Sequence, residues 1–320
     1  MIALRRIYFA LFLLLLLVPF VLSVEEDIFY RESMVLDLKL SSVIHLVPKT
    51  SDYYNEFVEA QLFFFPENDP RQEVQQLITF PKADKKEDYL LYHWDNPVDK
   101  NLLYSLDARL ETQNRFAEVK SKVGFPISSL ESEALIYTQP SKMIDVNQEM
   151  VDLSSSIAEG ETDMYSVVFK IANWVKSNVR YDLNTITADA TKSASWVLEN
   201  REGVCDEITT LFIALCRSLG IPTRFVSGIS YSNSDLFAAR PWGLHGWAEV
   251  YFHGYGWVPF DVTYGQFGYI DAGHIKLSDS LDADKSSSKF QWKSNNVDLQ
   301  SEELKTQVSI IERGEKLQEL

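Results

Sequence analysis

The chain has 320 residues, of which 46% are hydrophobic and 24% are charged, and its formal net charge is −16. This length allows one large domain or two ordinary ones, and the apolar fraction is sufficient for a complete hydrophobic core. The negative charge argues against nucleic acid as a partner, because the sequence offers no basic stripe that could neutralise phosphates. The acidity instead favours solubility or cationic partners.

Residues 1–23 have the pattern of a secretory signal peptide. Arg5 and Arg6 form a short basic region, and an apolar run with a single proline follows over 7–22. This run of about 16 residues is shorter than the ~20 that span a bilayer, so cleavage after Ser23 is favoured over an uncleaved membrane anchor. Either outcome predicts a protein that is secreted or attached through this segment to the outer face of the cytoplasmic membrane.

Residues 24–133 predict a β-rich N-terminal domain. Apolar and polar residues alternate in four short runs that are separated by Pro, Asn and Asp. These runs cover residues 35–40, 56–62, 89–94 and 102–110. Short strands with turn signals between them favour a small antiparallel sandwich. The region has no catalytic pattern, and His45 and His93 lie in strand-like runs where a structural role is expected.

Residues 134–280 predict a second domain that starts with helices. Residues 134–147 have few periodic apolar positions and are expected to be a connection. Helices are then expected over 148–158, 162–178 and 193–198. Trp174 borders the apolar face of the second helix, and Trp196 lies in the third.

The stretch 203–208, Gly-Val-Cys-Asp-Glu-Ile, opens a strongly helical segment, and a helix is expected over 206–219. Apolar residues recur on one face up to Leu219, and Gly220 and Pro222 predict the end of the helix. Cys205 therefore lies at a helix N-terminus, where the helix dipole and unpaired N–H groups are expected to lower the pKa of a thiol. Because a thiolate is a nucleophile, Cys205 is a candidate catalytic residue.

The chain has only two cysteines. Eleven residues of helix would separate Cys205 from Cys216 by about 16 Å, far beyond the ~7 Å that a disulfide allows between Cα atoms. Cys205 is therefore expected to be a free thiol, and Cys216 a small buried hydrophobe. The cysteines and histidines are too scattered for metal-ligand spacing, so we predict neither a metal nor a cofactor.

Three strands are predicted after the Cys205 helix, over 223–231, 245–253 and 257–264, with a loop over 232–244. The last two form a hairpin around Gly-Tyr-Gly at 254–256. His245 and Asp261 can share one face of this hairpin only if its loop has an odd number of residues, as with 253–255 or 252–256. A catalytic pairing of these two side chains therefore predicts the loop length.

Residues 281–320 are expected to form a C-terminal β extension or tail. Residues 277–289 are rich in Ser and Asp and predict a surface loop or linker. Added strands are expected over 290–292 and 304–310.

Four separated motifs resemble the transglutaminase-like superfamily. They are Gly-Val-Cys-Asp-Glu at 203–207, Leu-Cys-Arg-Ser-Leu-Gly-Ile-Pro-Thr-Arg at 215–224, His-Gly-Trp-Ala-Glu-Val at 245–250, and Gly-Trp-Val-Pro-Phe-Asp-Val-Thr at 256–263. The resemblance covers roughly residues 134–275 and implies a papain-like fold with a Cys-His-Asp triad in this chain order. The fold class expected is α+β, with a papain-like, transglutaminase-like core preceded by a β-sandwich-like domain.

The sequence departs from the family pattern at several positions. Gly246 stands where the family usually has Ala, and Val262 stands where Pro is usual. The Gln-Cys-Trp signature of the animal protein-crosslinking enzymes is absent, since Val204 and Asp206 flank Cys205. These departures put crosslinking activity in doubt more than the triad.

The resemblance implies a role for each site residue. Cys205 would attack an acyl carbonyl and form a thioester, while His245 would take the thiol proton and protonate the leaving amine. Asp261 would orient the imidazole. The Cys205 backbone N–H is one expected oxyanion donor. The animal enzymes use an upstream Trp as the second, for which Trp174 and Trp196 are the candidates here.

The function expected is that of an exported thiol acyl-transfer enzyme acting on amide or peptide bonds of a protein or peptide substrate. A peptidase or amidase is favoured, since the crosslinking signature is missing. The first alternative is a protein-glutamine transglutaminase that forms isopeptide bonds. The second is an inactive extracellular scaffold or binding protein. The sequence carries no signal for an oligomeric state.

Overall fold

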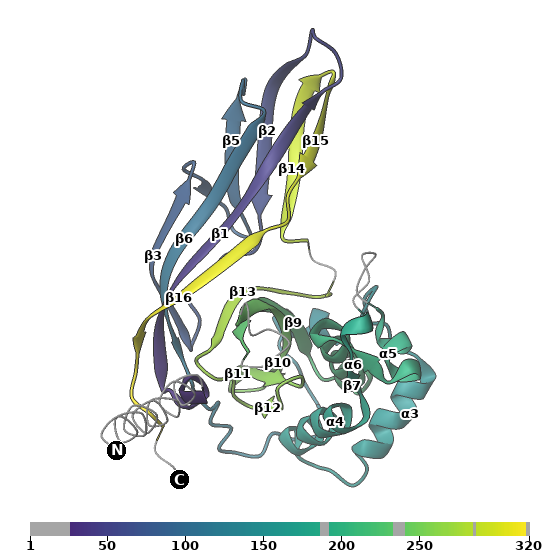
Figure 1. Ribbon diagram of the computed structural model, residues 1–320. Coiled ribbons are helices and arrows are strands. Elements are labelled where there is room, and N and C mark those ends of the chain that lie inside the picture. Colours follow the sequence, from purple (N-terminus) through teal and green to yellow (C-terminus); the bar gives the residue numbers. More distant parts are fainter. Residues whose placement is uncertain (1–25, 186–191, 233–240, 284–285, 318–320) are drawn as a thin grey trace, which may run out of the picture.

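An elongated β-sandwich makes up one part of the molecule (Figure 1). The computed structural model describes residues 26–185, 192–232, 241–283 and 286–317. The strands of the sandwich are β1 (Ser33–Pro48), β2 (Tyr54–Leu62), β3 (Gln72–Phe80), β4 (Asp84–Lys85), β5 (Leu90–Asp95), β6 (Asn101–Gln113), β14 (Ser288–Asn295), β15 (Val297–Ser301) and β16 (Lys305–Arg313). One antiparallel sheet has the order β15–β1–β6–β3 with β16 also on β1, and the other has the order β14–β2–β5–β4. Alternate residues of β1 are buried, as expected for a strand with one face on a core.

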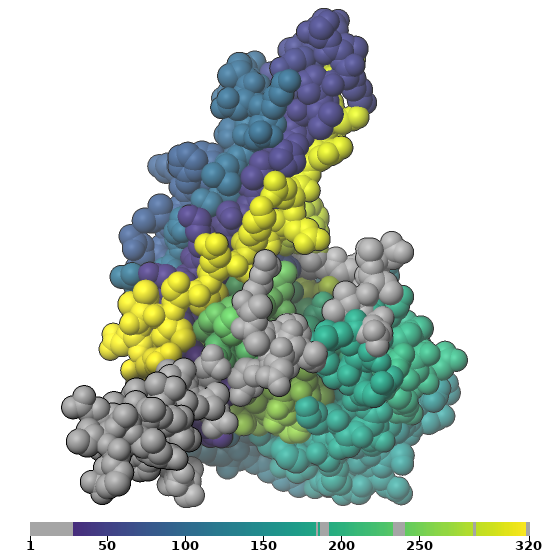
Figure 2. Space-filling model, viewed as in Figure 1, coloured from purple at the N-terminus to yellow at the C-terminus, as the bar shows by residue number. Residues whose placement is uncertain are grey.

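The strand predictions hold for most of the sandwich. β1, β2, β5 and β6 overlap the four predicted runs, while β3 was not predicted. β14 and β16 overlap the strands predicted near the C-terminus, and they pair with β2 and β1. The C-terminal segment therefore belongs to the sandwich by its hydrogen bonding, and Figure 2 shows it in yellow along the purple β1. The domain limits at 23, 133 and 280 remain predictions.

The second part of the molecule combines helices with a five-stranded antiparallel sheet of order β12–β11–β10–β9–β13. Its strands are β9 (Thr223–Tyr231), β10 (Trp242–Phe252), β11 (Gly256–Asp261), β12 (Gln266–Phe267) and β13 (His274–Ser280). Its main helices are α3 (Gln148–Ile157), α4 (Met164–Asn178), α5 (Ala194–Asn200) and α6 (Cys205–Ser218). Short elements are η1 (Glu26–Tyr30), α2 (Ser132–Leu135), η2 (Ile136–Thr138), β7 (Arg180–Tyr181), η3 (Leu183–Thr185) and β8 (Glu202–Gly203). The predicted α+β class is confirmed.

The helix α6 is the centre of this second part. It contacts β9 and β10 and is surrounded by α3, α4 and α5 (Figure 1). All residues over 207–217 are buried, and each large apolar side chain among them contributes roughly 1.5–3 kcal/mol to folding. The helix stops as predicted, because Gly220 adopts a φ of +72° and Pro222 follows it. The rigid helix thus positions its first residue, Cys205, against the sheet.

The sandwich packs directly on the edge of the core sheet. Ile229, Ile275 and Leu277 belong to the same apolar cluster as the sandwich strands. The predicted surface loop over 277–289 is therefore wrong in its first part. β13 extends to Ser280 and pairs with β9, because its apolar residues face this shared cluster.

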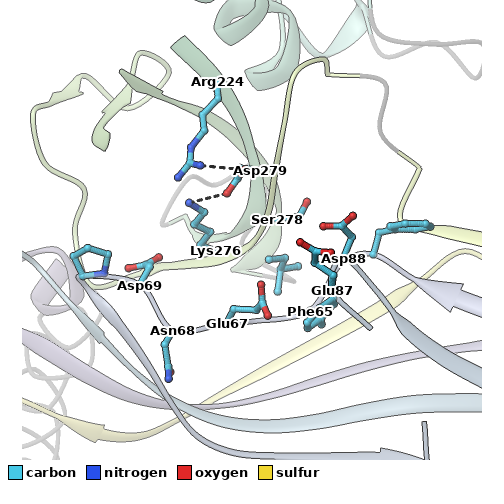
Figure 3. A pocket seen from close by; sticks show the side chains of 13 residues that line it. Phe65, Glu67, Asn68, Asp69, Glu87, Asp88, Arg224, Lys276, Ser278 and Asp279 are labelled. Atoms are coloured by element: carbon cyan, nitrogen blue, oxygen red, sulfur yellow. Dashed lines mark ion pairs between the residues drawn. The ribbon is translucent and has the colours of Figure 1, made fainter. Parts of the chain in front are cut away.

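An ionic network holds the core strands at this junction. A hollow of about 310 Å³ is lined on the sandwich side by Phe63, Phe65 and residues 67–70 and 87–88, and on the core side by Arg224, Lys276 and Asp279 among others (Figure 3). Asp279 pairs with Arg224 at 3.1 Å and with Lys276 at 3.2 Å. Burial would raise the pKa of Glu249, but Lys276 and Arg224 together lower it to about 2. β9, β10 and β13 are therefore crosslinked by charge as well as by hydrogen bonds.

Some predictions fall outside the described residues. The expected signal segment 1–23 lies there, as do residues 233–240 of the expected 232–244 loop. Residues 242–244 of that loop are instead the start of β10. Within the part of the chain that the structure describes, no helix is long and apolar enough to cross a membrane.

Candidate active site

Cys205 is the first residue of α6, one position earlier than the predicted helix start. The N-terminus of α6 is capped by Glu207, whose Oε2 accepts a hydrogen bond from the Val204 N–H at 3.0 Å. Both cysteines are free, as predicted. Cys216 is completely buried, whereas Cys205 keeps some exposure to solvent. Only Cys205 is therefore placed to meet a substrate.

His245 and Asp261 lie on neighbouring antiparallel strands, β10 and β11. The connecting loop has three residues, 253–255, because Phe252 pairs with Gly256, and the predicted odd loop length is confirmed. Both side chains consequently share one face of the hairpin, and His245 Nε2 lies 2.7 Å from Asp261 Oδ2. Since a carboxylate can only accept, Nε2 carries the proton and Nδ1 is left as the basic nitrogen.

The Asp261 carboxylate is fully buried and has several donors. Its Oδ1 accepts from the Tyr264 N–H at 2.9 Å, and its Oδ2 also lies 3.2 Å from His274 Nε2. Burial alone would raise the pKa of Asp261, but the charges and hydrogen bonds of His245 and His274 hold it well below its usual range. The Tyr264 ring stacks on the His245 imidazole with centroids 4.7 Å apart and fixes its plane.

His274 was not predicted as a site residue. It starts β13, is buried, and places Nδ1 3.0 Å from Asp271 Oδ1. The only local sign of a functional role was that two titratable residues, Asp271 and His274, lie three positions apart near the end of the region that resembles the family. Burial lowers the pKa of His274, but Asp271 and Asp261 outweigh it and raise the pKa to about 9.

The side-chain ligand atoms of His245, Asp261 and His274 lie within 4.8 Å of one another. Such a group could be considered for a metal ion. However, a nitrogen of each histidine already lies at hydrogen-bond distance from the same oxygen of Asp261. Hydrogen bonding therefore accounts for the arrangement without a metal.

The surroundings of the Cys205 thiol differ from the prediction. Its Sγ donates to Asp206 Oδ1 at 3.5 Å, and the backbone of Gly246, the residue after His245, acts to lower the pKa of the thiol. Burial, the charge of Asp206 and that of Asp261 raise the pKa of the thiol well above its usual value. The predicted lowering by the helix N-terminus is thus outweighed, and the resting thiol keeps its proton.

Gly246 allows the Asp206 carboxylate to reach this position. A Cβ on Gly246 would lie only 2.5 Å from Asp206 Oδ1 and 2.6 Å from Phe225 Cζ. The glycine that replaces the usual alanine of the family therefore makes room for an acid beside the nucleophile. Burial and the neighbouring Glu207 raise the pKa of Asp206.

The two candidate tryptophans lie in the helices around α6. The Trp174 ring is 4.6 Å from the Arg201 guanidinium, and the Trp196 ring is 5.9 Å from Lys192 Nζ. Both also pack on the apolar core, so their role as oxyanion donors remains a prediction. Tyr181 was missed by sequence reasoning. Burial raises the pKa of its phenol.

Comparison with known proteins identifies the core. Residues 151–262 match the family model of the transglutaminase-like superfamily. The chain carries a transglutaminase-like core. Curated relatives of the chain include the uncharacterised protein YebA of Bacillus subtilis, which is 27% identical over 41% of this chain and 19% of YebA. An uncharacterised protein of Haemophilus influenzae is 25% identical over 51% of this chain and 55% of its own length. The chain thus spans less than two thirds of these relatives.

A solved structure shares the architecture of most of the chain. A Cytophaga hutchinsonii protein, provisionally named a cysteine protease, has a TM-score of 0.62 at 19% identity. The match covers 88% of this chain and 91% of the Cytophaga chain. The periplasmic domain of TgpA from Pseudomonas aeruginosa has a TM-score of 0.40 at 14% identity, with 76% of this chain and 91% of that chain covered. The first likeness covers the sandwich as well as the transglutaminase-like core. The fold is therefore shared over most of the chain.

Proposed function

We propose that this protein is an exported thiol hydrolase that cleaves amide or peptide bonds through a thioester on Cys205. The observation that carries the proposal is the junction of α6 with β10. Asp206 Oδ1 lies 3.5 Å from the Cys205 sulfur and packs against Gly246, and the residue before Gly246, His245, donates to Asp261 at 2.7 Å. A thiol at the start of the helix thus lies beside the hairpin that carries a base and an acid that orients the base.

The reaction starts from a protonated thiol, because burial and Asp206 raise the pKa of Cys205. His245 Nδ1 takes this proton as the sulfur attacks the substrate carbonyl, and Asp261 stabilises the imidazolium through the Nε2 hydrogen bond. The Cys205 backbone N–H at the helix N-terminus stabilises the oxyanion. General base catalysis therefore replaces the preformed thiolate that the helix position alone predicts.

The tetrahedral adduct then collapses to the thioester. Its C–N bond breaks, and the leaving amine takes the proton held on His245. Water attacks the thioester in the second half-reaction, giving its proton to His245 and releasing the carboxylic acid. The thiolate that leaves takes this proton back. In the transglutaminase alternative, a primary amine replaces water in this step.

Export is supported by the sequence of residues 1–23, in which a basic start precedes an apolar run that ends before an acidic stretch. We propose a secreted or outer-face location on this basis. The substrate is proposed to be a protein or peptide.

The test is product analysis with purified protein, denatured casein and a fluorescent primary amine. Hydrolysis gives new peptide termini or free ammonia that depend on Cys205, and the Cys205→Ala variant gives neither. The matched control is Cys216→Ala, which should keep activity, because Cys216 is buried well along α6.

Each other outcome overturns part of the proposal. Incorporation of the amine in a Cys205-dependent manner would establish the transglutaminase. Equal hydrolysis by the wild-type protein and the folded Cys205→Ala variant would refute a thiol enzyme, and the absence of any product with the folded wild-type protein would favour the scaffold.

A further inference from the structure

We propose that His274 is a positioning residue that remains an imidazolium and holds the Asp261 carboxylate toward His245. The inference rests on the proposed function, because it assigns a task to a residue behind the same triad. His274 is 1% exposed and does not reach a substrate. It acts through Asp261.

The geometry around the ring determines its charge. His274 Nε2 lies 3.2 Å from Asp261 Oδ2, and its Nδ1 lies 3.0 Å from Asp271 Oδ1. A neutral imidazole has one donor and one acceptor nitrogen, so one of its nitrogens would face a carboxylate with a lone pair. Only an imidazolium donates to both carboxylates at once.

The second carboxylate is itself fixed. Asp271 Oδ1 accepts from the Gly273 N–H at 2.7 Å, and Asp271 Oδ2 accepts from Gln266 Nε2 at 2.5 Å. Gln266 in turn accepts from the Asp271 N–H through its Oε1 at 2.9 Å. The acid therefore has a set orientation before His274 binds to it. Three aromatic rings complete the surroundings of His274, namely those of His245, Trp247 and Tyr264.

The charges of this cluster match the needs of the reaction. Asp261 and Asp271 are two buried carboxylates, and the His274 imidazolium balances one of them. One negative charge is left in a buried site, and it is available to stabilise His245 when His245 takes the thiol proton. Without the His274 cation, Asp261 would share its site with an uncompensated second acid. It would also lose one of its donors.

The direct test is ¹⁵N NMR of the purified protein labelled at histidine. The chain has only five histidines, and the spectrum of a His274→Gln variant assigns the resonance. We expect both nitrogens of His274 to carry protons throughout pH 5 to 8. An unprotonated nitrogen on His274 at pH 7 would overturn the proposal. This measurement needs no turnover, so it stands apart from the test of the proposed function.

The variant tests the consequence for the site. His274→Gln should lower the rate of Cys205-dependent hydrolysis by about 10- to 100-fold through kcat, because a small misplacement of a catalytic group has effects of this size. It should also expose the His245 Nε2–H to faster solvent exchange. The matched control is His253→Gln, since exposed His253 lies 2.6 Å from a single carboxylate, Glu131, and should leave both readouts unchanged.

The opposite results are also informative. A folded His274→Gln protein with wild-type kcat and unchanged exchange at His245 would refute the positioning role. If that variant does not fold, the NMR result on the wild-type protein still decides the charge of His274. A stoichiometric metal ion that is bound by the wild-type protein and lost from the variant would replace the hydrogen-bonded cluster with a metal site.

Discussion

Replacing Asp206 with Asn should make Cys205 react faster with iodoacetamide at neutral pH. The Asp206 Oδ1 lies 3.5 Å from the sulfur, so its negative charge opposes formation of the thiolate. Two unit charges at this distance interact by about 5 kcal/mol at an effective dielectric constant of about 20, and by about 1 kcal/mol in water. Cys205 is partly exposed, and the raised pKa of Asp206 reduces its average charge. We therefore expect the Asp206 charge to oppose thiolate formation by about 1 kcal/mol, the lower of these two values.

An effect of this size is measurable. Since about 1.4 kcal/mol corresponds to a factor of ten, an effect of about 1 kcal/mol should raise the thiolate fraction and the alkylation rate roughly fivefold at pH 7. Mass spectrometry follows the modification over pH 5 to 9 in a Cys216→Ala background, where only Cys205 can react. Asp298→Asn is the matched control, because it removes an equal charge from an exposed pair with Lys49 in the sandwich.

The outcome separates two accounts of the thiol. Faster alkylation of Asp206→Asn alone means that the neighbouring acid, rather than the helix N-terminus, dominates the reactivity of Cys205. An unchanged or slower rate in a folded variant would refute this reasoning. Asp206 would then be a residue whose charge is already neutralised at pH 7.

Three further predictions concern the same region. Gly246→Ala should lower the free energy of unfolding by about 1–3 kcal/mol, because the new methyl group overlaps the Phe225 ring. Denaturant titration measures this free energy, and a value equal to that of the wild-type protein would contradict the prediction. His245→Ala should reduce hydrolysis far more than Asp261→Asn, since it removes the base, whereas the other change removes only orientation and charge support; initial rates with casein decide the order. The His274 cation should stabilise the fold fully below its unfolded pKa of about 6.5, and this stability should be lost as the pH rises through its folded pKa of about 9. Thermal midpoints should therefore fall between pH 7 and 10, and less so in His274→Gln.

Local sequence patterns were enough to predict the elements that carry the candidate triad. The apolar spacing before Gly220 and Pro222 predicted α6 to within one residue, because helix periodicity and helix termination are encoded in adjacent residues. The odd parity of His245 and Asp261 predicted that they share a face only across a loop with an odd number of residues, and the observed loop has three. The fold class was predicted from the resemblance of four motifs to the transglutaminase-like superfamily.

Only the tertiary structure decided the chemistry around those residues. Asp206 lies against the sulfur because β10 approaches α6 at Gly246, a contact between segments about forty residues apart. His274 reaches Asp261 because β13 pairs with β9, and no local pattern predicts which strands become neighbours. The same reason explains why the C-terminal strands return to the sandwich. Local periodicity determines an element, whereas pKa values and strand partners depend on which distant groups are brought into contact.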